Sequence, residues 1–312
     1  MAVTAAMVKE LREITGAGMM DCKKALSETD GDMDKAVDYL REKGLAGAQK
    51  KAGRIAAEGI VTTAVSEDGK NAVIVEVNSE TDFVAKNEKF QDYVKEIAEQ
   101  LLNSDVKDLD TFLASPWAKD PSMTVQEKLS SMISVIGENM NIRRFGRLSV
   151  EDGVIVSYIH MGGKIGVLVK VDSDKVDPSI IEMAKNVAMQ TAALKPQFCT
   201  DKDVPADFLE KEKEILRAQI ENDPKEASKP DKVKEGMLMG RLNKELKEIC
   251  LLDQVYVKAE DGKQSVKNYI AETAKANGAN ASVNEFIRYE TGEGLQKKEE
   301  DFAAEVAKQM GN

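Results

Sequence analysis

The sequence predicts an α+β protein, because helical and strand-type hydrophobic patterns follow one another along the chain and one mixed unit occurs twice. Residues 4 to 44 carry apolar side chains at helical spacing, whereas from residue 58 apolar and polar residues alternate as in half-buried strands. This strand pattern returns 94 residues later. We therefore expect an N-terminal three-helix bundle, a duplicated α+β core with antiparallel sheets, an inserted antiparallel helical hairpin and a C-terminal helical tail.

Residues 1–54 are expected to form a three-helix docking domain followed by its linker. The three helical stripes consist of Val8, Leu11 and Thr15, then Cys22, Ala25 and Leu26, then Met33, Ala36, Val37 and Leu40. Asp30-Gly31-Asp32 is a typical cap for the third helix. A bundle this small buries little surface and commonly binds a partner. The Gly-, Ala- and Lys-rich stretch from 43 to 57 predicts a partly helical linker that leaves the bundle independently folded.

The core is expected to contain two copies of one unit, at 55–149 and at 150–197 with 251–290. Strands are predicted at 58 to 66 and 71 to 78, around the turn Glu67-Asp68-Gly69-Lys70. Adding 94 to each number gives the second copy without a gap, so that Gly59 matches Gly153, Gly69 matches Gly163, Lys70 matches Lys164, and Val73, Val75 and Val77 match Val167, Val169 and Val171. Strand and turn residues agree together, which chance composition would rarely produce.

An insertion of about fifty residues is predicted in the second copy, at 198–250. Near the ends of the copies, Asn141-Ile142-Arg143-Arg144-Phe145 resembles Glu285-Phe286-Ile287-Arg288-Tyr289, and the offset there is 144 instead of 94. The insertion has two helical runs joined by a Pro-bracketed turn, and each apolar seam is about two heptads long. Such a hairpin needs further packing, either on a second subunit, as a homodimer, or on its own core. Residues 291–312 remain as a C-terminal module.

Composition favours a protein partner in the cytoplasm. With 44 Lys+Arg against 55 Asp+Glu the net charge is −11, which argues against direct binding of nucleic acid or an anionic membrane. The chain contains neither an apolar stretch of about 20 residues nor the order of a signal peptide. Cys22, Cys199 and Cys250 lack C-x-x-C spacing, which favours buried thiols over disulfides or a zinc site.

The sequence offers no catalytic residue, metal site or cofactor motif. His160 is the only histidine, which excludes sites that need two imidazoles, and its place after the strand-like residues 154 to 159 is typical of an ordinary strand end. No phosphate-cradling G-x-x-x-x-G-K-[ST] loop is present, and Gly16-Ala17-Gly18 follows a helical pattern instead of a strand. An enzyme that uses an acidic pair is therefore the weakest hypothesis, since nothing selects a pair.

The turn Thr81-Asp82-Phe83-Val84-Ala85-Lys86-Asn87 permits two interpretations. In the structural one, Asp82 or Asn87 caps a helix and Phe83 begins its buried stripe, which continues at Phe90, Val94, Ile97 and Leu101. In the functional one, an exposed aromatic ring and a carboxylate form an interaction tip. The second copy favours the functional interpretation, because it makes the same strand-to-helix passage with Lys175-Val176-Asp177-Pro178-Ser179.

Several separated motifs together resemble bacterial translation elongation factor Ts, and the resemblance runs from end to end. They are the stretch Leu11-Arg12-Glu13-Ile14-Thr15-Gly16-Ala17-Gly18-Met19-Met20-Asp21-Cys22, the turn just described, Ile142-Arg143-Arg144, Ile165-Gly166-Val167-Leu168-Val169 and Phe302-Ala303-Ala304-Glu305-Val306. Their order along the chain makes the set far more specific than any one motif.

The resemblance implies a guanine nucleotide exchange factor for elongation factor Tu, the GTPase that carries aminoacyl-tRNA to the ribosome. It further implies a ubiquitin-associated-like N-terminal bundle, dimerisation through the helical hairpin, and contacts of the bundle and the C-terminal tail with the GTPase. The residues implied to disturb the magnesium ion of the GTPase are Thr81, Asp82, Phe83 and Val84. His160 is implied as a further partner contact, although Met161-Gly162-Gly163-Lys164 departs from the commoner G-A-R form.

No covalent chemistry is needed for such a factor, which agrees with the missing catalytic groups. The alternative hypothesis is a non-catalytic dimeric adaptor, in which a ubiquitin-associated-like bundle tethers partners without altering a nucleotide site. Release of labelled GDP from the GTPase distinguishes these hypotheses, because only the exchange factor accelerates release at catalytic amounts.

Overall fold

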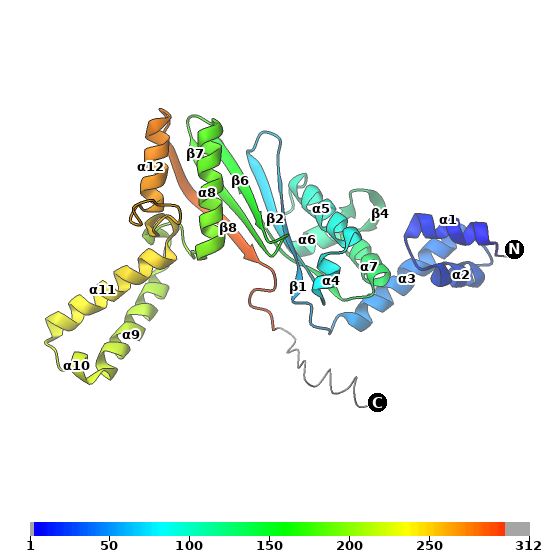
Figure 1. Cartoon of the computed structure of the whole chain (residues 1–312). Helices are drawn as coiled ribbons and strands as arrows, with labels where there is room; N and C mark the ends of the chain where they lie inside the picture. The colour runs from blue at the N-terminus through cyan, green and yellow to red at the C-terminus, as the bar shows by residue number, and fades with distance from the viewer. Residues whose placement is uncertain (1–2, 297–312) are drawn as a thin grey trace.

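The computed structural model describes residues 3–296 and confirms a mixed α+β fold with antiparallel sheets (Figure 1). Within this range the two copies pack sheet against sheet, with strand orders β1-β2-β5 and β6-β7-β8. The apolar layer between the sheets contains Val61, Ala72, Ile74, Leu148, Val150, Ile155 and Leu168. Helices cover the outer face of each sheet, so each sheet is buried on both faces (Figure 1).

The elements of the two copies follow the same order, apart from small additions. The first copy comprises β1 (Glu58–Val65), β2 (Asn71–Ser79), α4 (Asp82–Ala85), α5 (Glu88–Leu102), α6 (Leu109–Ala114), β3 (Pro116–Trp117), β4 (Asp120–Thr124), α7 (Val125–Ile136) and β5 (Met140–Ser149). The second comprises β6 (Gly153–His160), β7 (Ile165–Ser173), α8 (Pro178–Leu194), α12 (Val266–Ala276) and β8 (Ala281–Glu290). The strands expected at 58 to 66 and 71 to 78 are thus confirmed within one residue.

The copies are related by an approximate twofold axis, which confirms the repeat at an offset of 94. The amide of Val61 donates to the carbonyl of Gly163, and the amide of Ile155 donates to the carbonyl of Gly69, each at 2.8 Å. Both middle strands carry a β-bulge, after Glu76 in β2 and after its counterpart in β7. Sequence similarity at this spacing therefore reflects equivalent positions in space.

The offset of 144 at the ends of the copies is wrong, because strand pairing requires 141. Val77 pairs with Ile142 in the first sheet, and Val171 pairs with Val283 in the second. The similarity of the two basic stretches around Arg144 and Arg288 is three residues out of register. With an offset of 141 instead of 94, the insertion is 47 residues long, close to the fifty expected.

The N-terminal helices α1 (Ala5–Thr15), α2 (Met19–Glu28) and α3 (Met33–Lys51) pack around Leu11, Cys22, Ala25 and Leu26. The carboxylate of Asp32 caps α3, as its sequence indicates. The structure differs from expectation in the linker, because α3 continues to Lys51 and its second half packs on α7. The helices approach at Gly44, where a Cβ would make an ordinary contact of 3.8 Å with the carbonyl oxygen of Ser130.

Removing residues 1–54 should therefore destabilise the first copy, because it strips α3 from the surface of α7. We expect the free energy of unfolding to fall by about 1 to 3 kcal/mol. Removing only residues 1–31 keeps α3 and its cap Asp32, and should leave that free energy nearly unchanged. Fluorescence of Trp117, the only tryptophan and buried in the first copy, reports the unfolding transition during chemical denaturation. Equal stability of both truncated proteins would contradict the structural role of α3.

The inserted segment projects away from the second copy as α9 (Ala206–Asn222), α10 (Pro224–Ala227) and α11 (Asp231–Ile249) (Figure 1). Its two long helices pack on each other through Leu216, Ile220, Leu238 and Leu242. Folding back on the core, which the pattern permitted, is not what the structure shows. Ile215, Val233 and Met239 stay more than 40% exposed.

Three other expectations concern thiols, membranes and the C-terminus. Cys22, Cys199 and Cys250 are free and buried. None of the helices in residues 3–296 is long and apolar enough to cross a membrane. Of the C-terminal module expected at 291–312, residues 297–312 lie outside the described range.

Candidate partner-binding site

The predicted interaction tip forms a short helix that is separated from the helix behind it. Thr81 caps α4 by accepting a hydrogen bond from the amide of Val84, and Asn87 caps α5 by accepting from the amides of Lys89 and Phe90. Two caps six residues apart end one helix and start another, because a cap residue has extended backbone dihedrals. Asp82 caps neither helix.

Phe83 projects from α4 into solvent, with 79% of its surface exposed. Val84 and Ala85, the next residues along the chain, are buried against the first sheet. The interpretation of Phe83 as the start of the buried stripe is therefore wrong, whereas Phe90 is fully buried as expected. A large aromatic ring that stays outside a well-packed core does not stabilise the fold through burial, and a role in binding a partner would explain its exposure.

The base of the tip is fixed to the loop between α7 and β5. The hydroxyl of Thr81 donates to one carboxylate oxygen of Glu138 at 2.7 Å, and its amide donates to the other at 3.0 Å. The carboxylate of Glu80 accepts from the amide of Asn139 at 2.5 Å. Sequence reasoning missed Glu138, although the preceding Gly137, with φ +91°, is a recognisable helix end.

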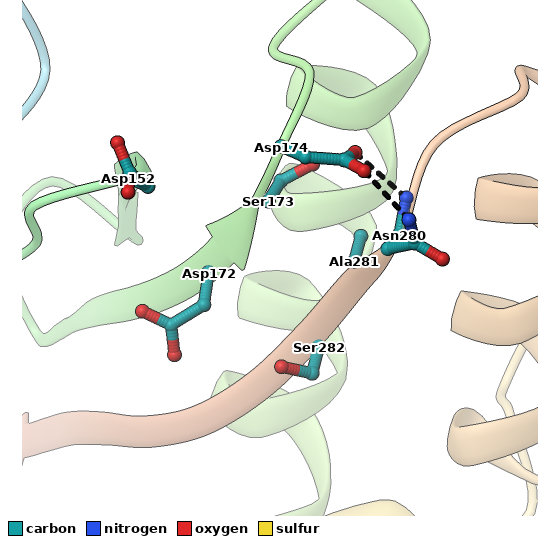
Figure 2. Close-up of a pocket in the computed structure, with 7 residues that line it drawn as sticks. All are labelled: Asp152, Asp172, Ser173, Asp174, Asn280, Ala281 and Ser282. Atoms are coloured by element: carbon teal, nitrogen blue, oxygen red, sulfur yellow. Dashed lines mark hydrogen bonds between the residues drawn. The ribbon is translucent and has the colours of Figure 1, made fainter.

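The second copy keeps the part of this support that Glu80 and Asn139 provide, but it has no separate short helix. Asp174, the counterpart of Glu80, accepts two hydrogen bonds from Asn280, at 2.8 and 2.6 Å (Figure 2). Helix α8 then begins at Pro178, which corresponds to Val84, so no separate short helix precedes it. The fold therefore does not require a short helix at this position, and the tip is a feature of the first copy alone.

The acidic cavity around Asp174 has a volume of about 600 Å³ and includes Asp152 and Asp172 (Figure 2). Among residues 3–296, no group of three or more His, Cys, Asp or Glu side chains is arranged to hold a metal ion. We assign no role to this cavity.

Two lysines act on the carboxylate of the tip. Lys86 pairs with Asp82 at 2.7 Å and lies 6.0 Å from the centre of the Phe83 ring. The hydrogen bond from Lys86 lowers the pKa of Asp82, and the charge of Lys164 lowers it further. Lys164 also pairs with Glu58 at the start of β1. The turn between β6 and β7 therefore lies on the same side of the core as the tip.

His160 ends β6 on that same turn and is exposed. Its Nδ1 lies 2.8 Å from the hydroxyl of Tyr158. The next residue, Met161, is 73% exposed and has a left-handed backbone, with φ +50°. The structure thus places His160 and the tip on two turns that Lys164 links electrostatically, although it puts no contact between His160 and the tip.

A second exposed apolar surface lies on the N-terminal bundle. Ile14, Met19 and Met20 are each more than half exposed, at the junction of α1 and α2. Exposed apolar side chains that lie together on a surface are a feature of protein-binding sites.

Comparison with known proteins agrees with the sequence motifs. A family described as Elongation factor TS matches residues 80–293. The chain is 54% identical to Elongation factor Ts of Clostridium novyi (strain NT) over 308 residues, which cover 99% of each chain. It is 53% identical to Elongation factor Ts of Trichlorobacter lovleyi over 315 residues, which cover all of this chain and 99% of the relative.

Proposed function

The chain belongs to the elongation factor Ts family, and from this premise we propose that it is a guanine nucleotide exchange factor for elongation factor Tu in translation elongation. The main structural support for the proposed site is Phe83, which is exposed on a helix with its own cap. In this proposal the ring is a wedge that enters the GTPase near its magnesium ion, and Asp82 is the polar anchor beside it. Thr81 and Val84 hold the tip on the core.

Displacing the magnesium ion promotes GDP release, because the ion helps to bind the nucleotide. A GTPase holds its nucleotide through a phosphate-cradling loop and through the ion that bridges the phosphates to the protein. An aromatic ring inserted at this site weakens the binding of GDP by the phosphate-cradling loop and by the magnesium ion. By linkage, the nucleotide weakens binding of the exchange factor by the same factor, so incoming GTP ends the complex. The factor therefore acts without covalent chemistry and needs neither catalytic side chains nor a cofactor of its own.

Further contacts with the GTPase are proposed for the N-terminal bundle, through the surface around Ile14, Met19 and Met20, and for the C-terminal tail. His160 is proposed as an additional contact beside the tip. We also propose a cytoplasmic homodimer that is joined through the hairpin at 198–250. Support for the dimer comes from the projecting helices and from their exposed apolar residues, such as Ile215 and Met239.

Release of fluorescent GDP from elongation factor Tu tests the exchange function. We expect substoichiometric amounts of the protein to accelerate release, because each molecule is displaced by new nucleotide and acts again. Binding without acceleration would instead support the dimeric adaptor. Magnesium concentration must be held constant, since the ion is the proposed point of attack.

A further inference from the structure

A fully buried carboxylate, Glu76, lies on β2 just before its bulge, on the face between the two sheets. It accepts hydrogen bonds from Arg143 at 3.0 Å, Arg144 at 2.6 Å and the side-chain amide of Asn78 at 3.0 Å. A further bond of 2.8 Å comes from the backbone amide of Gly292, 216 residues away in sequence. Burial raises the pKa of Glu76, but these donors outweigh burial and place it below its ordinary value. The group is therefore a buried anion.

The fold itself does not demand this anion. The equivalent residue in the second copy is Lys170, whose side chain is 24% exposed and lies 3.8 Å from Glu285. Both copies form the same bulged three-stranded sheet around these opposite charges. Because a buried charge costs free energy unless it is fully paired, a fully buried carboxylate found in only one copy indicates a requirement beyond the sheet.

Gly292 belongs to the turn after β8, residues 291 to 293, which contacts the β6–β7 turn and the segment before β1, and β1 in turn packs against the tip helix α4. On one side, Thr291 donates through its hydroxyl to the carbonyl of Gly163 at 3.0 Å and through its amide to the carbonyl of Lys164 at 2.9 Å. On the other side, Gly292 lies so close to the residue before β1 that a Cβ would be 2.1 Å from the carbonyl oxygen of Ala57. The chain then continues toward the C-terminal segment.

We propose that Glu76 is a positioning residue for nucleotide exchange, which anchors the turn at 291 to 293 and so fixes the Phe83 tip, the His160 turn and the start of the C-terminal segment relative to one another. The inference rests on the proposed function. A rigid arrangement allows binding free energy from the outer contacts to press the ring into the nucleotide site. A loosened arrangement would still bind the GTPase but would release GDP more slowly.

The matched variants Gly292→Ala and Gly294→Ala separate this role from general backbone strain. Both glycines have left-handed backbones, with φ +73° and +74°, so both variants carry a similar conformational cost. Only the Cβ at 292 collides with backbone, whereas the Cβ at 294 would meet just Arg143 Nη2 at 3.9 Å. Glu76→Gln adds a third variant that keeps the shape of the side chain but removes its charge.

Hydrogen exchange of the free protein is measured first. We expect Gly292→Ala and Glu76→Gln, but not Gly294→Ala, to increase amide exchange in residues 80–86 and 160–164 together. Unchanged exchange in these segments would overturn the proposal whether or not the protein acts on a GTPase. Hydrogen exchange therefore tests the structural role of Glu76 independently of the proposed function.

Release of fluorescent GDP from elongation factor Tu is then titrated with each variant. We expect the maximal rate to fall about tenfold for Gly292→Ala and Glu76→Gln, with a half-saturating concentration within about threefold of the parent. Partial unfolding would instead lower the concentration of folded exchange factor, and would therefore raise the total protein concentration needed for half-saturation. Loosened turns with the parent maximal rate would overturn the positioning role. A parent protein that fails to accelerate release would overturn the proposed function alone.

Discussion

Phe83→Ala should slow maximal GDP release from elongation factor Tu by more than about tenfold, because the proposed wedge acts on the nucleotide site after the complex has formed, and a tenfold change in rate corresponds to about 1.4 kcal/mol of barrier. The same change should alter the free energy of unfolding by less than about 1 kcal/mol, because the ring is 79% exposed and leaves no cavity when it is removed. Both quantities are needed for one variant. Release kinetics at fixed magnesium give the rate of GDP release, and chemical denaturation followed by Trp117 fluorescence gives the free energy of unfolding.

Phe90→Ala is the matched control, seven residues along the chain. Its ring is fully buried against the first sheet, so the truncation should cost about 3 to 5 kcal/mol of stability. Any protein that stays folded should keep the tip and release GDP at the parent rate per folded molecule. A Phe83→Ala protein that folds normally and still releases GDP at the parent rate would refute the wedge.

Asp82→Ala tests the proposed contact of the Asp82 carboxylate with the GTPase, and it removes no helix cap. Thr81 and Asn87 supply the caps, so the variant loses the exposed ion pair with Lys86 and the weaker attraction of Lys164. Exposed pairs contribute little to stability. Slower release with an unchanged unfolding transition would therefore assign Asp82 to partner contact.

The repeat allowed the sheets to be predicted from sequence alone. Glycines with unusual backbones recur at equivalent places, and Gly59 and Gly153, with φ +130° and +141°, lie against backbone where a Cβ would not fit. Such positions constrain the residue type strongly, so both copies show them. The end of each copy was harder, because the two basic stretches resemble each other at an offset of 144 whereas their strands pair at an offset of 141.

The path of α3 could not be predicted, because it depends on tertiary contacts with α7, whereas the break before α5 follows from the local caps Thr81 and Asn87. Gly44 and Gly47 weaken the helical pattern, yet this half of α3 is helical and packs on α7. The exposure of Phe83 was likewise ambiguous, because a phenylalanine at helical spacing from Phe90 fits a buried stripe. Glu76 gave no signal, since an acidic residue in an alternating strand normally faces solvent.

The largest expected change in assembly follows from removing the hairpin. Residues 200–249 can be replaced by a short Gly/Ser link, because Phe198 pairs with Cys250 and the cut ends are already adjacent. The core should stay folded, since the hairpin packs along its own seam, but sedimentation at tens of micromolar should show a monomer in place of a dimer. GDP release should persist, because the tip lies in the other copy.

A double variant, Ile215→Lys with Met239→Lys, provides the control that keeps the hairpin. Both side chains are 41% exposed, so charging them leaves the seam of Leu216, Ile220, Leu238 and Leu242 in place. If these helices meet a second subunit through their exposed apolar side chains, unpaired charges at the contact should also give a monomer. A dimer that survives removal of the hairpin would show that the subunits join elsewhere, and a parent protein that is monomeric at this concentration would refute the dimer itself.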